Sequence, residues 1–224
     1  MSRTVSFGYW SDPMCIWAFV AQRKLDALLR RHGDVLAVDY RVVPVFGSVP
    51  ERFSRGAWSR SGVAGRVEAT ARIAAEHGHP EVTGEVWAHD PPSSSWAAGA
   101  PIKAVIAGEA AGEVPEGLSA TYQWRLRCAM FVENRNIARR DVQLAVAEEL
   151  DLARAPIERR LDDGSALAAL FEDHQERERL RIQGSPTYVF DGGRAMLYGN
   201  FDEAVLGATV EALVAGLKVG GSAC

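Results

Sequence analysis

A cysteine stands in the stretch DPMCIWA, residues 12–18, where an alternating apolar segment gives way to a helical pattern. The residues from Thr4 to Tyr9 alternate as in a short strand. Apolar residues then recur at helical spacing from about Met14 to Arg31, and Gly33 ends the helix. The first N–H groups of a helix lack intrahelical partners, and the helix dipole favours negative charge there. This position predicts a cysteine that ionises readily to the reactive thiolate.

Two features leave the reactivity of Cys15 open. A charged Asp12 would raise the pKa of the thiol if it approached the sulfur, so the helix effect wins only if Asp12 points into solvent. The alternative is a small buried cysteine that packs against the sheet, because free cysteine is among the most buried residue types.

In the rest of the chain, the spacing of apolar residues changes from a strand pattern to a helical one and then back. A second strand is predicted over Val35–Val43, with Val38, Tyr40 and Val42 on one apolar face. Its short link to the first helix favours a parallel βαβ unit. Near the end, Thr187–Phe190 and Ala195–Tyr198 flank a hairpin turn, and a helix follows over Asp202–Leu217. Five helices are predicted between these parts, over Val63–His77, Ala98–Ala111, Ser119–Val132, Asp141–Leu150 and Ser165–Leu180.

This order of elements predicts an α/β fold with an all-helical insertion. The α/β domain comprises residues 1–45 and 181–224, and the helical domain comprises residues 46–180. The second distinctive motif, GSPT at residues 184–187, directly precedes the predicted hairpin. Proline is acceptable as the first residue of a strand, and the generic expectation for its peptide bond is trans.

The two motifs, in this order, resemble the DsbA-like branch of the thioredoxin superfamily. The likeness is closest to its cytoplasmic FrnE-type members, and kappa-class glutathione transferases and 2-hydroxychromene-2-carboxylate isomerases share the architecture. Asp12, Cys15 and Trp17 match the pattern Asp-x-x-Cys-x-Trp-Cys of that group. The segments DPPSSSW, residues 90–96, and NIARR, residues 136–140, also look like parts of it. The resemblance covers nearly the whole chain and implies a thioredoxin-like fold with a helical insertion.

The resemblance also implies roles for two residues of the second motif. Pro186 would be a cis-proline facing Cys15. The backbone of Ser185 would pair with a bound peptide or thiol like an added strand, since main-chain hydrogen bonds make few demands on ligand sequence.

Three tryptophans are candidates for the walls of an apolar pocket over the thiol. Trp17 falls in the first turn after Cys15 and Trp96 opens a helix of the insertion. Trp10 begins the turn, residues 10–13, that is predicted to follow the first strand. The alternative is that they fill the core, as most tryptophans do.

One departure from the pattern decides the expected mechanism. The second cysteine of the family motif would stand at position 18, where this chain has Ala18. Cys15 could therefore attack a disulfide but could not close a disulfide with a motif partner to release it. The preferred function is a monothiol thiol–disulfide oxidoreductase of DsbA/FrnE type. Its partner would be a disulfide-containing protein or a small-molecule thiol or electrophile, and a low-molecular-weight thiol such as glutathione or mycothiol would act as co-substrate.

Two alternative functions follow from the same residues. One is a glutathione-dependent transferase or isomerase acting on a small molecule, although such enzymes usually have serine where Cys15 stands. The other is a non-catalytic binding protein that kept the fold, which the loss of the partner cysteine at Ala18 would explain. Cys128 is predicted to be core packing, and Cys224 ends a glycine-rich tail that either resolves a disulfide at Cys15 or has no role.

Composition limits the classes of partner and the cellular location that we expect. The chain has 224 residues and a formal net charge of −4, which gives no reason to expect nucleic acid. No long apolar run and no signal-peptide pattern is visible, so we expect a cytoplasmic protein without a membrane span. His77 and His79 lack the further ligands of a metal site, and no bound cofactor is expected. A homodimer is left open.

Overall fold

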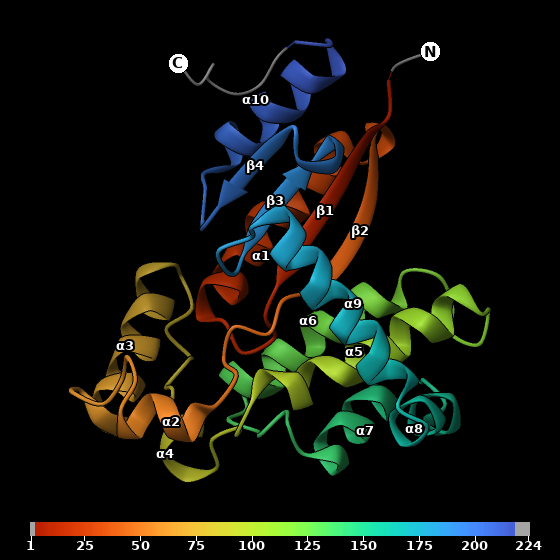
Figure 1. The fold of residues 1–224 in the computed structure, drawn as a ribbon. Coiled ribbons are helices and arrows are strands. Elements are labelled where there is room, and N and C mark those ends of the chain that lie inside the picture. The colour runs from red at the N-terminus through yellow and green to blue at the C-terminus, as the bar shows by residue number, and fades with distance from the viewer. Residues whose placement is uncertain (1–2, 218–224) are drawn as a thin grey trace.

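The computed structural model describes residues 3–217 and is built on a four-stranded sheet with the order β2-β1-β3-β4 (Figure 1). The strands are β1 (Val5–Ser11), β2 (Leu36–Val42), β3 (Thr187–Phe190) and β4 (Ala195–Tyr198). β1 pairs parallel to β2 and antiparallel to β3, and β3 forms the predicted hairpin with β4. The two ends of the described chain thus share one sheet.

Two helices cover one face of this sheet. They are α1 (Ile16–His32) and α10 (Glu203–Val214), which pack against each other. The alternation of β1 directs every second side chain to this face. The core here consists of Val5, Phe7, Tyr9, Leu25, Leu28, Leu36, Tyr188, Phe190, Ala195, Leu206, Val210 and Leu213.

Eight helices lie between β2 and β3 in the chain. They are α2 (Val49–Ser54), α3 (Gly62–Glu76), α4 (Val86–His89), α5 (Ser95–Ala110), α6 (Leu118–Phe131), α7 (Arg140–Glu148), α8 (Arg154–Asp162) and α9 (Ser165–Leu180). In Figure 1, α2–α4 lie to one side below the sheet and α5–α8 to the other, while α9 runs up in front of it. Short 3₁₀ turns occupy Gly33–Val35 and Asp191–Gly193.

The helical block and the sheet are joined through the start of α1. Met14, Ile16, Phe19 and Val20 belong to the same buried cluster as the helices of the block. The division into residues 1–45 with 181–224 and residues 46–180 therefore stays a proposal about chain order.

The structure corrects several local predictions. The turn predicted to begin at Trp10 is wrong, because β1 continues to Ser11, and α1 begins at Ile16 with Cys15 as its N-cap. Helices α2, α4 and α8 were not predicted, because they are short and bury few residues. Leu217 lies beyond the end of α10 and is exposed.

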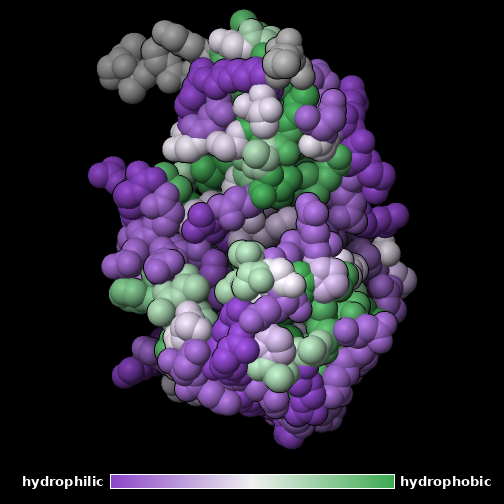
Figure 2. Space-filling model, turned by 90° about the vertical axis from the view of Figure 1, so that its right-hand side faces the viewer, coloured by the Kyte–Doolittle hydropathy of each residue, from purple (hydrophilic) through white to green (hydrophobic). Residues whose placement is uncertain are grey.

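The edge of the sheet explains another difference. Val38 was expected on an apolar face, but it is 37% exposed because β2 is an edge strand. Figure 2 views the right-hand side of Figure 1 and shows a hydrophobic patch in the upper half and smaller ones among the hydrophilic residues of the lower half. Within residues 3–217, none of the helices combines the length and apolar content that a membrane span requires.

Candidate functional site

Cys15 lies where the N-terminus of α1 meets the loop before β3. Its side chain is almost buried, at 5% exposure, and its Sγ–H donates to the backbone carbonyl of Ser185 over 3.3 Å. These two residues are 170 positions apart in the chain. The peptide bond between Ser185 and Pro186 is cis. The structure thus brings the two sequence motifs into direct contact.

Asp12 forms hydrogen bonds that hold the backbone around this contact. Its carboxylate accepts hydrogen bonds from the backbone N–H groups of Met14, at 2.7 Å, and Val45, at 2.6 Å. Its own N–H donates to the hydroxyl of Ser185 over 2.8 Å. Burial raises the pKa of the Asp12 carboxyl to about 6, although these hydrogen bonds oppose the shift. The condition under which the helix effect would win, an Asp12 that points into solvent, is therefore not met, because the side chain is fully buried and accepts hydrogen bonds from backbone donors.

The thiol is not the ready thiolate that its helix position favours. Burial raises the pKa of the Cys15 thiol, and the charge of Asp12 adds to this shift. Hydrogen bonds from Ser185 and from the first turn of α1 act in the opposite direction without overcoming it. Arg66 interacts electrostatically with this thiol, and its guanidinium carbon lies 4.5 Å from the ring centroid of Trp58 and 4.8 Å from that of Trp87. The resting thiol is therefore protonated near neutral pH.

A cleft of about 440 Å³ opens beside the contact between Cys15 and Ser185. Trp17 forms one wall, is 40% exposed and meets the ring of His77 edge-on, with 5.5 Å between ring centroids. Asn200, another lining residue, accepts a hydrogen bond at its Oδ1 from Lys24 Nζ over 3.0 Å. The residues lining the cleft are Trp17, His77, Ser185, Tyr198, Gly199 and Asn200. This combination offers aromatic surfaces, an amide, an imidazole and backbone groups to a small ligand.

The structure separates the other two candidate tryptophans from this cleft. Trp10 lies on the opposite face of the sheet, buried with Val43, Ile182 and Val189. Trp96 packs against the main core and meets the ring of His174. Neither lines the cleft, so Trp17 is the one of the three that stands at the site.

Sequence reasoning missed His77, Tyr198 and Asn200. A signal existed for the last two, because Tyr198 pairs with Thr187 in the hairpin and Gly199 N–H donates to the carbonyl of Pro186. Residues that follow β4 must therefore lie beside the Ser185 loop. No local signal could have brought His77, at the end of α3, to the same place.

The remaining thiols and histidines form no second centre in the described part of the chain. Cys128 is half-buried, and burial raises the pKa of its thiol to about 11. Cys224 lies outside the described residues. Residues 3–217 hold no group of three or more histidine, cysteine or acidic side chains that could bind a metal ion.

Comparison with known proteins agrees with this architecture. The family model described as a DSBA-like thioredoxin domain matches residues 103–211. No curated protein sequence matches the chain. Among solved structures, a candidate protein disulfide isomerase from Nitrosomonas europaea has a TM-score of 0.75 at 14% identity, with 96% of this chain and 99% of that chain covered.

Two further structures resemble the chain. The cytosolic disulfide reductase DsbM from Pseudomonas aeruginosa, solved with GSH, is 25% identical with a TM-score of 0.64, over 94% of this chain and 98% of that chain. A 2-hydroxychromene-2-carboxylate isomerase is 17% identical with a TM-score of 0.65, over 93% and 95% of the two chains. The chain therefore has the DsbA-like thioredoxin fold, and a DSBA-like thioredoxin domain model matches residues 103–211 of it.

Proposed function

We propose that the chain is a monothiol thiol–disulfide oxidoreductase in which Cys15 is the nucleophile. The observation that carries the proposal is the 3.3 Å contact between Cys15 Sγ and the Ser185 carbonyl at the edge of an open cleft. A disulfide bound in this cleft lies next to Ser185, the residue whose carbonyl accepts the hydrogen bond of the Cys15 thiol. That carbonyl loses its thiol donor when Cys15 reacts, and it can then accept an N–H from the bound ligand.

The reaction consists of two thiol–disulfide exchanges. In the first, the Cys15 sulfur attacks one sulfur of a disulfide, so that a mixed disulfide forms and the other half leaves as a thiol. In the second, an external thiol such as glutathione or mycothiol attacks the mixed disulfide. It is thereby oxidised to a new disulfide, and Cys15 returns to the thiol. The external thiol is needed because position 18, in the buried first turn of α1, is alanine.

The substrate is either a disulfide-containing protein or a small molecule. The cleft volume and its aromatic walls suit a peptide-sized thiol, and the DsbM structure that contains GSH supports glutathione as the first candidate. That neighbour is described as cytosolic, which is compatible with the cytoplasmic location expected from the sequence.

A second candidate is a glutathione-dependent isomerase or transferase. The structural likeness to the 2-hydroxychromene-2-carboxylate isomerase favours it. In that case the protonated Cys15 would donate a hydrogen bond to the sulfur of a bound thiol instead of attacking a disulfide. The two candidates use the same cleft and differ in whether a covalent adduct forms.

Intact-mass measurement separates them. The single variant C224S, which keeps Cys15, and the double variant C15S/C224S are treated with hydroxyethyl disulfide at neutral pH. We expect one adduct on C224S, which is absent from C15S/C224S and is removed by added glutathione. Absence of the adduct, together with turnover of an electrophile by glutathione, would establish the second candidate. Absence of both would leave a binding protein.

A further inference from the structure

His77 presents a defined proton acceptor to the cleft. Its Nδ1 lies 2.8 Å from the backbone carbonyl of Ile73, one turn earlier in α3. A carbonyl oxygen can only accept, so Nδ1 carries the proton and Nε2 holds the lone pair of the neutral ring. Within residues 3–217, Nε2 has no hydrogen-bond partner, and it is not among the buried unpaired atoms. The ring is thus oriented by the protein and free at its second nitrogen.

His77 lies in the same cleft as the residue that contacts the Cys15 sulfur. It lines the cleft together with Trp17 and Ser185. Trp17 lies two residues after Cys15, and Ser185 accepts the hydrogen bond of the thiol. A thiol that enters the cleft therefore meets both the imidazole of His77 and Ser185, the residue in contact with the Cys15 sulfur.

The release step needs protons to move in two places. The incoming thiol must lose its proton, because the thiolate is the nucleophile. Cys15 must then leave as a thiolate in a buried position, and a leaving thiol of high pKa leaves slowly. Burial raises the pKa of this thiol, so its departure is favoured when a proton is delivered to it.

On the basis of the proposed function, we propose that His77 transfers the proton in the release step. Nε2 accepts the proton of the incoming thiol as its sulfur attacks the mixed disulfide. A new disulfide forms between that sulfur and the bound group, and the bond from Cys15 breaks. The Cys15 sulfur takes the electron pair and receives the proton from Nε2–H. No other oxidant or reductant is required.

The charged and titratable groups around His77 come from three elements. On α1, Arg23 lies beside Gly78 and Lys24 is bound to Asn200. Glu76 precedes His77 on α3, and Tyr198 faces the cleft from the end of β4. The nearby His79 is paired with Glu81.

The test measures release of the Cys15 mixed disulfide by glutathione between pH 6 and 9.5. The variant H77N keeps an N–H that can bond to the Ile73 carbonyl but lacks the acceptor at Nε2. The exposed His89, paired with Glu85, supplies the control H89N. We expect H77N to lower the rate constant about a hundredfold at pH 7. The deficit should shrink above about pH 8.5, where free thiols ionise without a base.

The outcomes separate this inference from the function on which it rests. If the wild type forms no adduct at Cys15, the proposed function fails. If the wild type turns over while H77N and H77Q match H89N, or show a deficit that does not change with pH, the proton-transfer role is refuted. H77Q serves as the second variant because it removes the Ile73 bond and the imidazole together, so equal deficits in the two variants would show that loss of the Ile73 bond is not the cause. Circular dichroism spectra of both are compared with the wild type.

Discussion

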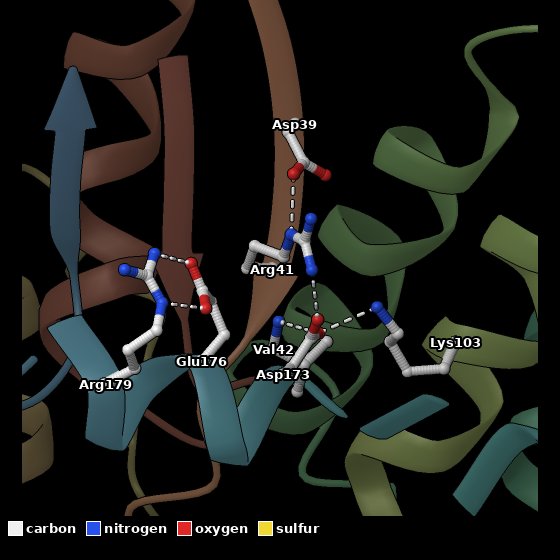
Figure 3. Close-up of polar contacts among 7 residues, drawn as sticks. All are labelled: Asp39, Arg41, Val42, Lys103, Asp173, Glu176 and Arg179. Carbon is white, nitrogen blue, oxygen red and sulfur yellow. Dashed lines mark hydrogen bonds and ion pairs between the residues drawn. The ribbon is translucent and has the colours of Figure 1, made fainter. Parts of the chain in front are cut away.

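Replacing Asp173 by asparagine should destabilise the fold far more than replacing its exposed neighbours. Figure 3 shows that the Asp173 carboxylate on α9 receives hydrogen bonds or ion pairs from three partners on two other elements. Lys103 Nζ on α5 lies at 2.8 Å, Arg41 Nη1 on β2 at 3.0 Å, and the backbone N–H of Val42 at 2.9 Å. The side chain of Asp173 is 1% exposed and that of Lys103 is 10% exposed.

The expected cost of D173N follows from this burial. The variant leaves the ammonium of Lys103 buried without a counter-charge, and breaking a buried ion pair from one side costs about 3–5 kcal/mol. The controls are D39N, which removes the other carboxylate on Arg41, and E176Q, which removes the pair with Arg179 (Figure 3). Both pairs are solvent-exposed, so each control should cost less than about 1 kcal/mol.

Urea-induced unfolding at pH 7 measures the free energy of unfolding of all three variants by linear extrapolation. An unchanged m-value shows that the comparison is valid. The double variant K103M/D173N should be less destabilised than D173N alone, because no uncompensated cation remains. A D173N protein as stable as D39N would refute the reasoning, and so would a double variant whose losses simply add.

Three further predictions concern the site. Burial raises the pKa of folded Asp12 to about 6, so the folded state keeps a proton that the unfolded chain releases above about pH 4. The free energy of unfolding of the wild type should therefore fall by up to about 3 kcal/mol relative to that of D12N between pH 4 and 7. Urea unfolding at several pH values measures this difference. S185A removes the buried acceptor of Asp12 N–H and should cost about 1–3 kcal/mol, a value that thermal unfolding checks; a neutral result would contradict the geometry. A18C should form a disulfide with Cys15 and shed the hydroxyethyl adduct without glutathione, whereas persistence of the adduct would count against the proposed release step.

Local patterns made much of the fold predictable. The alternation in β1, the apolar spacing in α1 and the hairpin turn after β3 are each encoded within a few residues, and each element formed. The contact between Cys15 and Ser185 came from a resemblance, since nothing in either motif alone specifies a partner 170 residues away.

The unpredicted features depend on long-range packing. The burial of Asp12 requires the N–H of Val45, which follows β2, and the place of His77 requires α3 to dock against α1. Trp10 is different, because strand alternation with Tyr9 already directs it to the opposite face from the helix that carries Cys15. Its expected role at the pocket neglected that alternation.

A short run of backbone donors connects the buried ion pairs to the thiol. Val42 N–H donates to Asp173, Val43 N–H donates to the carbonyl of Ser11, and Val45 N–H donates to Asp12. Asp12 in turn binds Ser185, whose carbonyl holds the Cys15 thiol. These hydrogen bonds fix the path of residues 42–45 at the end of β2. The same short segment therefore contacts both Asp173 on α9 and Asp12 at the site. The stability of the Asp173 variants and the reactivity of Cys15 should therefore be measured on the same proteins, because a loosened segment would alter both the burial of Asp12 and the pKa of the thiol beside it.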